Sequence, residues 1–209
     1  MRRLVVGPAI LALAAATLTG AWADDQDIAR KVAERLKQQQ KEGNLHGFDI
    51  NLKAGVYQNL TFINNTITNN ISAGSTGITG YGGGIYLKAA DAAVVEGNTI
   101  ISNSASQATS YGSGGGICLQ ESDTQVVNNL ITENYGASIG SYGYGGGITS
   151  YMGAPTIKGN TISENWANKW ANLNYGSALG SFYDGSLVQD NLVSGNHGTN
   201  AVYLQYSTA

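Results

Sequence analysis

The chain is poor in charge, proline and cysteine. Of its 209 residues, 12% are charged, two are Pro and one is Cys, and the formal net charge is -3. No Arg follows Arg35, so most of the sequence lacks the basic patch that nucleic-acid-binding surfaces need. The single Cys118 has no partner for an internal disulfide, and we expect it to be a small residue within a sheet. These shortages exclude a nucleic-acid partner and a disulfide framework.

Long apolar runs are also scarce, and the one that exists is at the N-terminus. Arg2 and Arg3 precede the apolar residues 4–18, and residues 21–23 (Ala-Trp-Ala) have the form of a signal-peptidase site. A membrane-spanning helix needs roughly 18 or more apolar residues, which no later stretch approaches. We therefore expect residues 1–23 to be a signal peptide, the protein to be exported to the periplasm, the exterior or the cell surface, and the mature chain to have no transmembrane segment.

Glycine is abundant, with 29 residues, and it belongs to a repeat. The repeat is marked by Asn65, Asn98, Asn129, Asn160 and Asn191, at spacings of 33, 31, 31 and 31 residues. A glycine-led aliphatic position recurs in step as Ile85, Ile117, Ile148, Leu179 and Val202. Such a period indicates stacked supersecondary units. We expect about five rungs, each with three short strands around an aliphatic core.

The repeat also predicts how columns of side chains stack. The recurring Asn residues should lie at a bend, where Asn tolerates left-handed dihedrals and can hydrogen-bond to the Asn above. A second Asn ladder follows at Asn70, Asn103, Asn134, Asn165 and Asn196. Alternation along the glycine-led strand turns another column outward, namely Tyr86, Cys118, Thr149, Gly180 and Tyr203.

Together, the glycine-led strands, Asn ladders and aliphatic columns over about residues 57–206 resemble the right-handed parallel β-helix repeat family. That family includes pectate lyases, many polysaccharide-active proteins and periplasmic NosD-like proteins. The resemblance implies an all-β fold, a right-handed single-stranded parallel β-helix, for residues 57–209. Activity does not follow from it, because one fold serves many functions.

The segment 24–56 differs from the repeats. Acidic residues precede an amphipathic pattern at Ile28, Val32 and Leu36, which predicts a helix followed by a short strand. This segment resembles the first half of a BON domain, a small periplasmic module, but the repeats begin by Phe62, where that family continues. We expect the helix to cap the first rung, since the ends of a solenoid need covering. The chain is alternatively a fragment, or a fusion joined near residue 57.

The most distinctive feature is an extra loop of about eight residues in each of the first four rungs, rich in Tyr, Trp, Gly and Ser. Register places Tyr144 over Tyr175, Tyr135 over Trp166 and Tyr142 over Leu173. Aromatic rings suit stacking on sugar rings, and they equally suit packing on each other. Our candidate binding residues are Tyr81, Tyr111, Tyr135, Tyr142, Tyr144, Trp166, Trp170 and Tyr175.

Carboxylates offer weaker candidates for chemistry. Glu133 and Glu164 share a column on adjacent rungs, at a spacing that a retaining glycosidase would use. Asp91, Glu121 and Asp123 form a second group, for which calcium is the possible ion. His197 lacks a recognisable nucleophile nearby, and we expect it to be a surface residue.

The pectate-lyase-like enzymes use an Arg base and a cluster of Asp calcium ligands on an outer strand face. This chain has no Arg in its repeats, and its outward column contains no acid. We therefore expect an exported, non-catalytic module that binds an extended partner, a glycan or another cell-surface polymer, through the aromatic loops, or that serves as a surface scaffold. The alternatives are a polysaccharide-active hydrolase or lyase and a structural protein that self-associates end to end.

Overall fold

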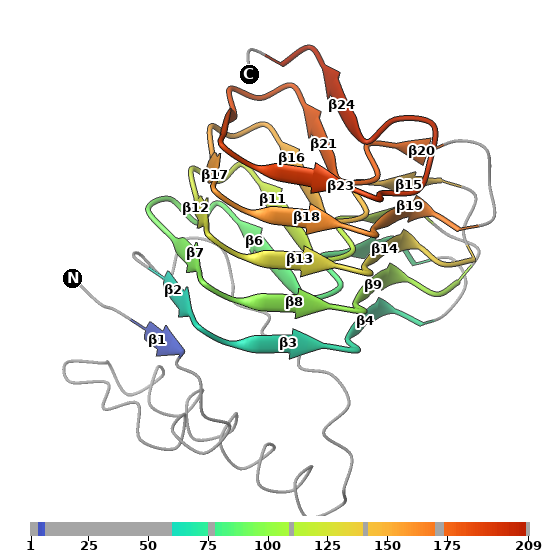
Figure 1. Cartoon of the computed structure of the whole chain (residues 1–209), viewed down its shortest axis with the longest axis horizontal. Helices are drawn as coiled ribbons and strands as arrows, with labels where there is room; N and C mark the ends of the chain where they lie inside the picture. The colour runs from blue at the N-terminus through green and yellow to red at the C-terminus, as the bar shows by residue number, and fades with distance from the viewer. Residues whose placement is uncertain are drawn as a thin grey trace, which may run out of the picture.

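The structure, a computed structural model, describes residues 4–6, 60–74, 78–108, 111–139, 142–169 and 174–207. In this part of the chain all regular structure is β-strand, and the strands coil into a stack of rungs (Figure 1). The helix predicted within 24–56, and the signal peptide apart from its residues 4–6, lie outside the described residues. Among the described residues, no helix is long and apolar enough to cross a membrane.

The strands form five parallel sheets, which we name A to E in chain order. Sheet A consists of β1 (Leu4–Val6), β2 (Leu60–Ile63), β7 (Val94–Glu96), β12 (Gln125–Val127), β17 (Thr156–Lys158) and β22 (Leu187–Gln189). Sheet B consists of β3 (Thr66–Thr68), β8 (Thr99–Ile101), β13 (Leu130–Thr132), β18 (Thr161–Ser163) and β23 (Leu192–Ser194). Within both sheets, each strand pairs with the equivalent strand of the next rung.

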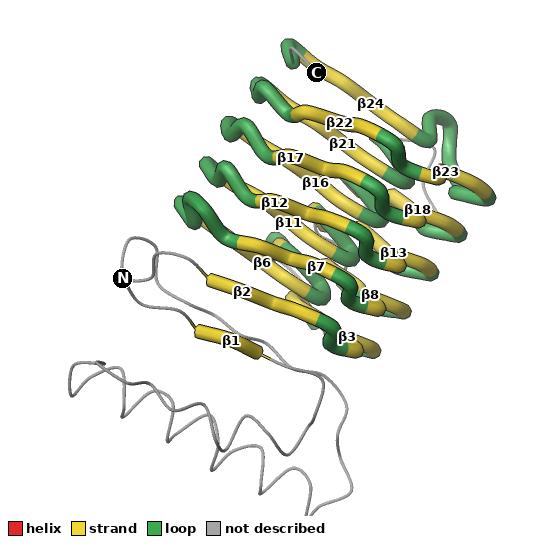
Figure 2. Tube along the Cα trace, turned by 60° about the vertical axis from the view of Figure 1, so that its left-hand side comes forward, coloured by secondary structure: helices red, strands yellow, loops and turns green. Residues whose placement is uncertain are grey.

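Sheets C and D have four strands each, because the last rung contributes to neither. Sheet C consists of β4 (Ile71–Ala73), β9 (Ser104–Ser106), β14 (Tyr135–Ala137) and β19 (Trp166–Asn168). Sheet D consists of β5 (Gly80–Tyr81), β10 (Gly112–Ser113), β15 (Gly143–Tyr144) and β20 (Asn174–Tyr175). Sheet E consists of β6 (Ile85–Lys88), β11 (Ile117–Gln120), β16 (Ile148–Tyr151), β21 (Leu179–Phe182) and β24 (Val202–Gln205). Figure 2 shows the rungs as layers of one stack.

Sheets A, B and E enclose the predicted aliphatic core. Ile85, Ile117, Ile148, Leu179 and Val202 are partners in register along sheet E. Ile100 and Ile131 of sheet B and Val126 of sheet A are 0% exposed. Since burial of apolar surface is the main favourable term in folding, these columns hold the rungs together. The sequence-based prediction of the columns is confirmed.

Two Asn ladders also run through the stack as predicted. The Oδ1 of Asn129 accepts hydrogen bonds from the backbone N–H and the Nδ2 of Asn98, both at 2.9 Å. The prediction that the ladder Asn is left-handed was wrong. The positive φ belongs to the preceding residue of the bend, as at Asn64 (55°), Asn128 (56°) and Asp190 (54°). This shift leaves the ladder Asn free to turn its amide into the stack, where it bonds to the Asn of the next rung; at the first rung, the buried Oδ1 of Asn70 has no hydrogen-bond partner.

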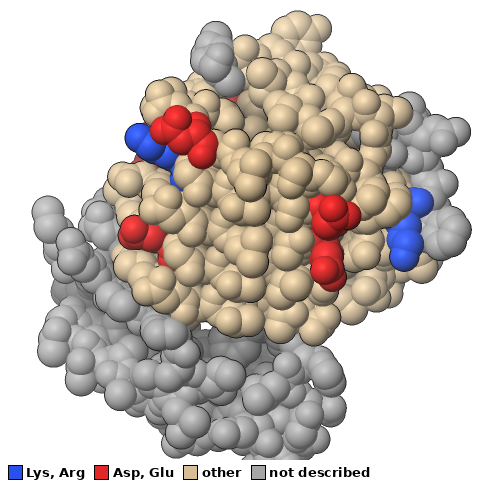
Figure 3. Space-filling view, in the orientation of Figure 1, with Lys and Arg blue, Asp and Glu red and all other residues tan. Residues whose placement is uncertain are grey.

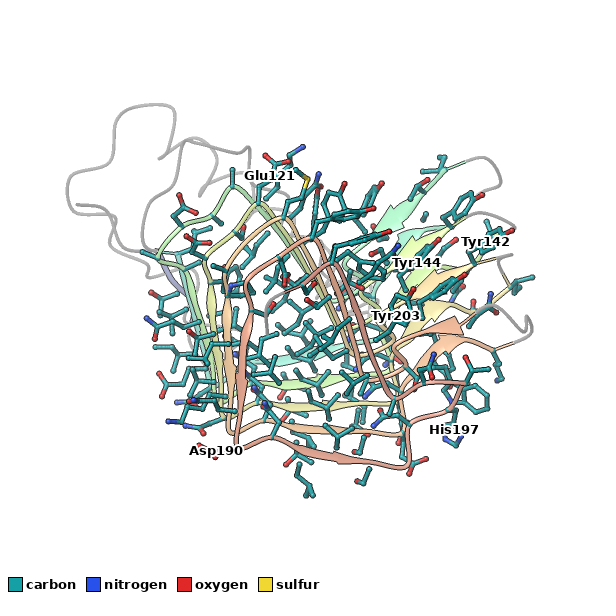
Figure 4. The ribbon with its side chains drawn as sticks, turned by 90° about the horizontal axis from the view of Figure 1, so that it is seen from above. Glu121, Tyr142, Tyr144, Asp190, His197 and Tyr203 are labelled. Atoms are coloured by element: carbon teal, nitrogen blue, oxygen red, sulfur yellow. The ribbon has the colours of Figure 1, made fainter. Side chains whose placement is uncertain are left out.

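The expectation of three strands and a loop in each rung was wrong as well, because the loop itself contains the strands of sheets C and D. These two sheets lie back to back and form a projection beside the coil, seen end-on in Figure 4. Glycine makes the close approach possible. A Cβ on Gly112 would overlap the carbonyl oxygen of Gly136, and one on Gly143 would overlap that of Ala167. A thin two-layer projection of paired strands therefore replaces the predicted loop.

A sharp turn joins sheet D to sheet E in each complete rung. Gly82, Gly114, Gly145 and Gly176 have φ between 53° and 67°, and a Cβ at any of these positions would overlap the carbonyl oxygen three residues later. Glycine alone accepts this left-handed turn without a steric cost. The turn sets the outward face of sheet D against the outer face of sheet E.

The two ends of the stack differ in exposure. In the first rung, Leu60 is 4% and Phe62 3% exposed, whereas Val188 and Val193 of the last rung are 37% and 38% exposed. Val202 and Leu204 of β24 are exposed as well. The apolar columns therefore reach the surface at the last described rung.

Candidate ligand-binding surface

Tyrosine gathers on one side of the coil. Ten of the twelve tyrosines lie in or beside sheets D and E: Tyr81, Tyr86, Tyr111, Tyr142, Tyr144, Tyr151, Tyr175, Tyr183, Tyr203 and Tyr206. We name this set, together with Phe182, the tyrosine face. Figure 4 shows Tyr142, Tyr144 and Tyr203 on the same side of the coil, at the angle between the projection and sheet E.

Strand alternation explains how sheet D aims its rings. Gly143 faces sheet C, so the next residue, Tyr144, points the opposite way, toward sheet E. The ring of Tyr144 meets Phe182 of sheet E edge to face, with centroids 5.5 Å apart. Tyr175 of sheet D likewise contacts Tyr203 of sheet E at 5.0 Å. Rings from the two sheets thus meet across the angle between them.

Other contacts run along the stack, from one rung to the next. Tyr144 stacks on Tyr175 with centroids 5.2 Å apart and planes 10° apart, as the register predicted. Tyr111 stacks on Tyr142 at 5.0 Å and 7°. Tyr183 and Tyr206, beyond the other ends of their sheet E strands, stack at 5.1 Å. The tyrosine face therefore contains three pairs of stacked rings, and each pair joins two adjacent rungs.

These rings keep much of their surface accessible. Tyr111 is 49% and Tyr183 52% exposed, while Tyr142, Tyr144 and Tyr175 are half-buried. Partial burial raises the pKa of Tyr144, and its tyrosine neighbours add to the rise. Burial is also the largest cause that raises the pKa of Tyr86, to about 12. The phenols of Tyr86 and Tyr144 are therefore neutral at physiological pH and can both donate and accept hydrogen bonds.

Charge is scarce on the tyrosine face. Lys88, at the end of β6, and Glu121, just after β11, belong to the first two rungs. In the later rungs, the last outward residues of the sheet E strands β16 and β21 are the uncharged Tyr151 and Phe182. On the opposite side of the molecule, where sheet B lies in front, charged side chains also occupy only small separate patches (Figure 3).

The outward column of sheet E is less accessible than alternation alone predicted. Cys118 and Thr149 do point away from the core, yet both are only 2% exposed. Sheet D covers them, and the Thr149 hydroxyl donates a hydrogen bond of 2.9 Å to the Tyr144 carbonyl. Burial raises the pKa of the Cys118 thiol to about 12, so the thiol is unreactive at neutral pH.

The structure divides the candidate aromatic residues between two surfaces. Tyr81, Tyr111, Tyr142, Tyr144 and Tyr175 belong to the tyrosine face. Tyr135 and Trp166 are partners in register on sheet C and point away from sheet D. Trp170 and Leu173, and with Leu173 the expected Tyr142–Leu173 contact, lie outside the described residues.

Sheet C presents its own short column. The Trp166 ring stacks on His197 with centroids 4.0 Å apart, and Lys169 Nζ lies 5.6 Å from the centre of the Tyr135 ring. Figure 4 shows His197 across the projection from Tyr142 and Tyr144. His197 continues the column of Tyr135 and Trp166 at the same spacing of 31 residues. That spacing would have identified it from the sequence.

Glu133 and Glu164 occupy equivalent bends, with φ of 56° and 52°. Glu133 accepts a hydrogen bond of 3.3 Å from Ser102, which belongs to the preceding rung. Glu164 instead lies 2.8 Å from His197 Nε2, in the following rung. These contacts direct the two carboxylates in opposite directions along the stack.

The acidic group proposed for calcium is spread over exposed turns. The Asp123 carboxylate accepts a hydrogen bond of 2.8 Å from the Ala154 amide, and Glu121 contacts its neighbour Gln120. Asp91 is exposed at the turn after β6. The described residues contain no group of three or more His, Cys, Asp or Glu side chains that could hold a metal ion.

Sequence reasoning missed half of the tyrosine face. Tyr151, Phe182, Tyr183 and Tyr206 were not singled out, and Tyr86 and Tyr203 were placed only as an outward column. Tyr151 and Phe182 are partners in register, as are Gly180 and Tyr203. Continuing the outward alternation to the end of each sheet E strand would have found Tyr151 and Phe182. The packing of sheet D against these residues has no such signal in the sequence.

Comparison with known proteins agrees with the fold. A family profile described as a right-handed β-helix region matches residues 83–209, more than half of the chain. No curated protein and no solved structure matches the chain.

Proposed function

The chain belongs to the right-handed β-helix family, and from that fold we propose that it binds an extended glycan along the tyrosine face. The observation that carries the proposal is the pairing of half-exposed, nearly parallel rings on adjacent rungs, Tyr111 with Tyr142 and Tyr144 with Tyr175. Stacked strands repeat about every 4.8 Å, so each pair extends along the stack. A polymer lying along the stack would meet both pairs.

The chemistry of the surface favours a sugar polymer. Tyrosine combines a large apolar ring with a polar tip and little conformational freedom, which suits the faces and hydroxyl groups of sugar rings. The tyrosine face offers such rings and hydroxyls, and its charged side chains are few. Tyrosine is also enriched in the cores of protein–protein interfaces, so a protein ligand is the outcome that the experiment must distinguish.

We propose binding without catalysis. Glu133 and Glu164 belong to the bends beside sheet C, and their carboxylates contact Ser102 and His197 respectively. The tyrosine face contributes Glu121 as its acid, at the exposed edge of β11. A glycoside hydrolase needs two carboxylates on either side of the scissile bond. A ligand on the tyrosine face would therefore be held rather than cleaved.

Affinity electrophoresis of the full chain through gels containing soluble polysaccharides tests this proposal. Retardation by at least one polymer is expected, together with its loss in a Tyr111→Ala/Tyr144→Ala variant. A Tyr135→Ala variant, altered on sheet C, is the matched control and should be retarded like the unchanged protein. Free migration in every gel, or equal retardation of all variants, would contradict the proposal. Capture of a protein partner by the same face would favour a different class of ligand.

We also propose that the protein is exported. The support is the basic start at Arg2 and Arg3, the apolar run to residue 18 and the small-residue site at 21–23. Cleavage by signal peptidase after Ala23 would remove β1, which pairs with β2 through Leu4 and Leu60. N-terminal sequencing of protein recovered outside the cytoplasm is expected to begin at Asp24. Recovery of only uncleaved chain from the cytoplasm would contradict export.

A further inference from the structure

We infer that the glycan bound by the tyrosine face is uncharged, an inference that rests on the proposed function. The sequence has few basic residues, and the structure shows how few of them lie near the rings. The described part of the chain contains three Lys and no Arg: Lys88, Lys158 and Lys169. Their positions decide whether an acidic polymer could be neutralised.

Two of the three lysines are directed elsewhere. Lys158 Nζ lies 3.7 Å from the Asp190 carboxylate at the bend between sheets A and B. Lys169 lies over the Tyr135 ring on sheet C, on the other side of the projection. Neither can serve a ligand that lies across sheets D and E.

Lys88 is the basic residue of the tyrosine face, and an acid accompanies it. It pairs in register with Gln120, which immediately precedes Glu121. Glu121 is close enough to Tyr86 to be among the causes that raise the pKa of that phenol. The first two rungs thus contribute one charge of each sign, which leaves no net positive charge.

The later rungs contribute no charge at the ring positions. Tyr142, Tyr144, Tyr175 and Tyr203 carry phenol groups, and Phe182 adds an apolar edge. Proteins recognise carboxylate and sulfate groups chiefly through Arg and Lys, because charge-assisted hydrogen bonds offset the loss of hydration. A uronate or sulfated sugar would lose its hydration here without gaining a cation. A neutral sugar loses only hydroxyl hydration, which the phenol groups can replace.

The low charge of the tyrosine face also predicts how ionic strength affects binding. Association between charged partners weakens as ionic strength rises, because salt screens exposed charges. Stacking of neutral sugars on neutral rings has no such electrostatic contribution. Binding at the tyrosine face should therefore be insensitive to ionic strength, in contrast to binding of an acidic polymer by exposed lysines.

Pairs of polymers that share a backbone and differ in charge test the inference with the full chain. Suitable pairs are hydroxyethyl and carboxymethyl cellulose, dextran and carboxymethyl dextran, and fully methyl-esterified and de-esterified pectin. The neutral member of the pair that binds is expected to bind at least about tenfold more tightly, with less than a twofold change between 50 mM and 500 mM salt. Lys158→Gln, altered at the bend between sheets A and B, is the matched control and should leave this affinity unchanged.

The outcomes separate the inference from the proposed function. If an acidic polymer binds more tightly than its neutral partner and Tyr144→Ala abolishes that binding, the ligand is charged and the inference fails while the proposed function stands. If no polymer binds, or if binding ignores Tyr144→Ala, the proposed function itself fails. Salt-sensitive binding that is lost in Lys88→Gln would likewise overturn the inference.

Discussion

The Tyr144 ring lies parallel to the Tyr175 ring of the next rung, with a centroid distance of 5.2 Å. The pairing of β15 with β20 fixes this contact, because Tyr144 and Tyr175 are partners in register. The two rings are therefore held about one strand spacing apart. Each of them also contacts a ring of sheet E, Tyr144 with Phe182 and Tyr175 with Tyr203.

Removing one ring should weaken glycan binding without unfolding the coil. Tyr144→Ala is expected to reduce affinity at least about tenfold, which corresponds to about 1.4 kcal/mol. Tyr144→Phe keeps the stacking ring and should lose less, since only the hydroxyl contact is removed. Calorimetric titration with the retained polysaccharide measures both variants. Equal losses in Phe and Ala would show that the hydroxyl, and not the ring, provides the affinity.

The stability of the folded chain should fall at alkaline pH. The pKa values of Cys118 and Tyr86 are each raised to about 12, from 9.0 and 10.0 respectively, so the unfolded chain loses these protons first. Stability is then complete below about pH 9 and declines as pH rises toward 12. Urea unfolding at pH 8 and pH 10.5 measures the decline. Cys118→Ala should make the decline of stability with pH shallower. A urea midpoint that does not change with pH in this range would contradict the raised pKa values.

The coil was predictable because its columns repeat. The spacing of Asn98, Asn129 and Asn160 gave the rungs, and the burial of Ile100 and Ile131 followed from alternation. The two-stranded projection was not predictable in the same way. Its strands are short and rich in Gly and Ser, with little hydrophobic periodicity, and contacts across the projection position them rather than local propensity. Gly136 of sheet C, for example, faces Gly112 of sheet D.

The free energy of unfolding should depend more on an Asn in the inner rungs of the ladder than on the Asn at its end. Asn134 Oδ1 accepts from the backbone N–H of Asn103 at 2.9 Å and from its Nδ2 at 3.0 Å. Asn134→Ala would leave the buried backbone N–H of Asn103 unpaired and would remove one of the two hydrogen bonds of its Nδ2, at an expected cost of about 1–3 kcal/mol in the free energy of unfolding. Asn196→Ala, at the partly exposed end of the same ladder, is the control and should cost less. Urea denaturation compares them, and equal losses would mean that the position in the ladder is irrelevant.

The back-to-back contact of sheets C and D should depend on glycine. A Cβ at Gly112 would overlap the backbone carbonyl of Gly136, which cannot move away without disturbing sheet C. Gly112→Ala is expected to destabilise the protein by about 2 kcal/mol or more, in the range typical of overpacking. Gly74→Ala is the matched control, because a Cβ there meets no atom within 4 Å. If both variants unfold at the same temperature, the projection is not packed as described.

The binding surface could be predicted only in part. The aromatic residues of the extra loops were visible in the sequence, yet the sequence placed Tyr135 and Tyr144 in one set of binding residues. On the two-residue strand β15, Gly143 faces Ala167 of sheet C, so Tyr144 points away from sheet C. Tyr144 and Tyr135 therefore lie on different surfaces. Contacts between non-adjacent segments decide which rings share a surface. The repeat period alone does not contain that information.

The most direct test of the tyrosine face is to identify which tyrosines a bound polymer covers. Tyrosine nitration followed by mass spectrometry, with and without a saturating concentration of the retained polysaccharide, measures the accessibility of each ring. We expect protection of Tyr111, Tyr142, Tyr144 and Tyr175, with Tyr135 on sheet C modified at the same rate in both samples. Protection of Tyr135 in place of Tyr111 and Tyr144, or unchanged nitration of every tyrosine in the presence of bound polymer, would contradict the account.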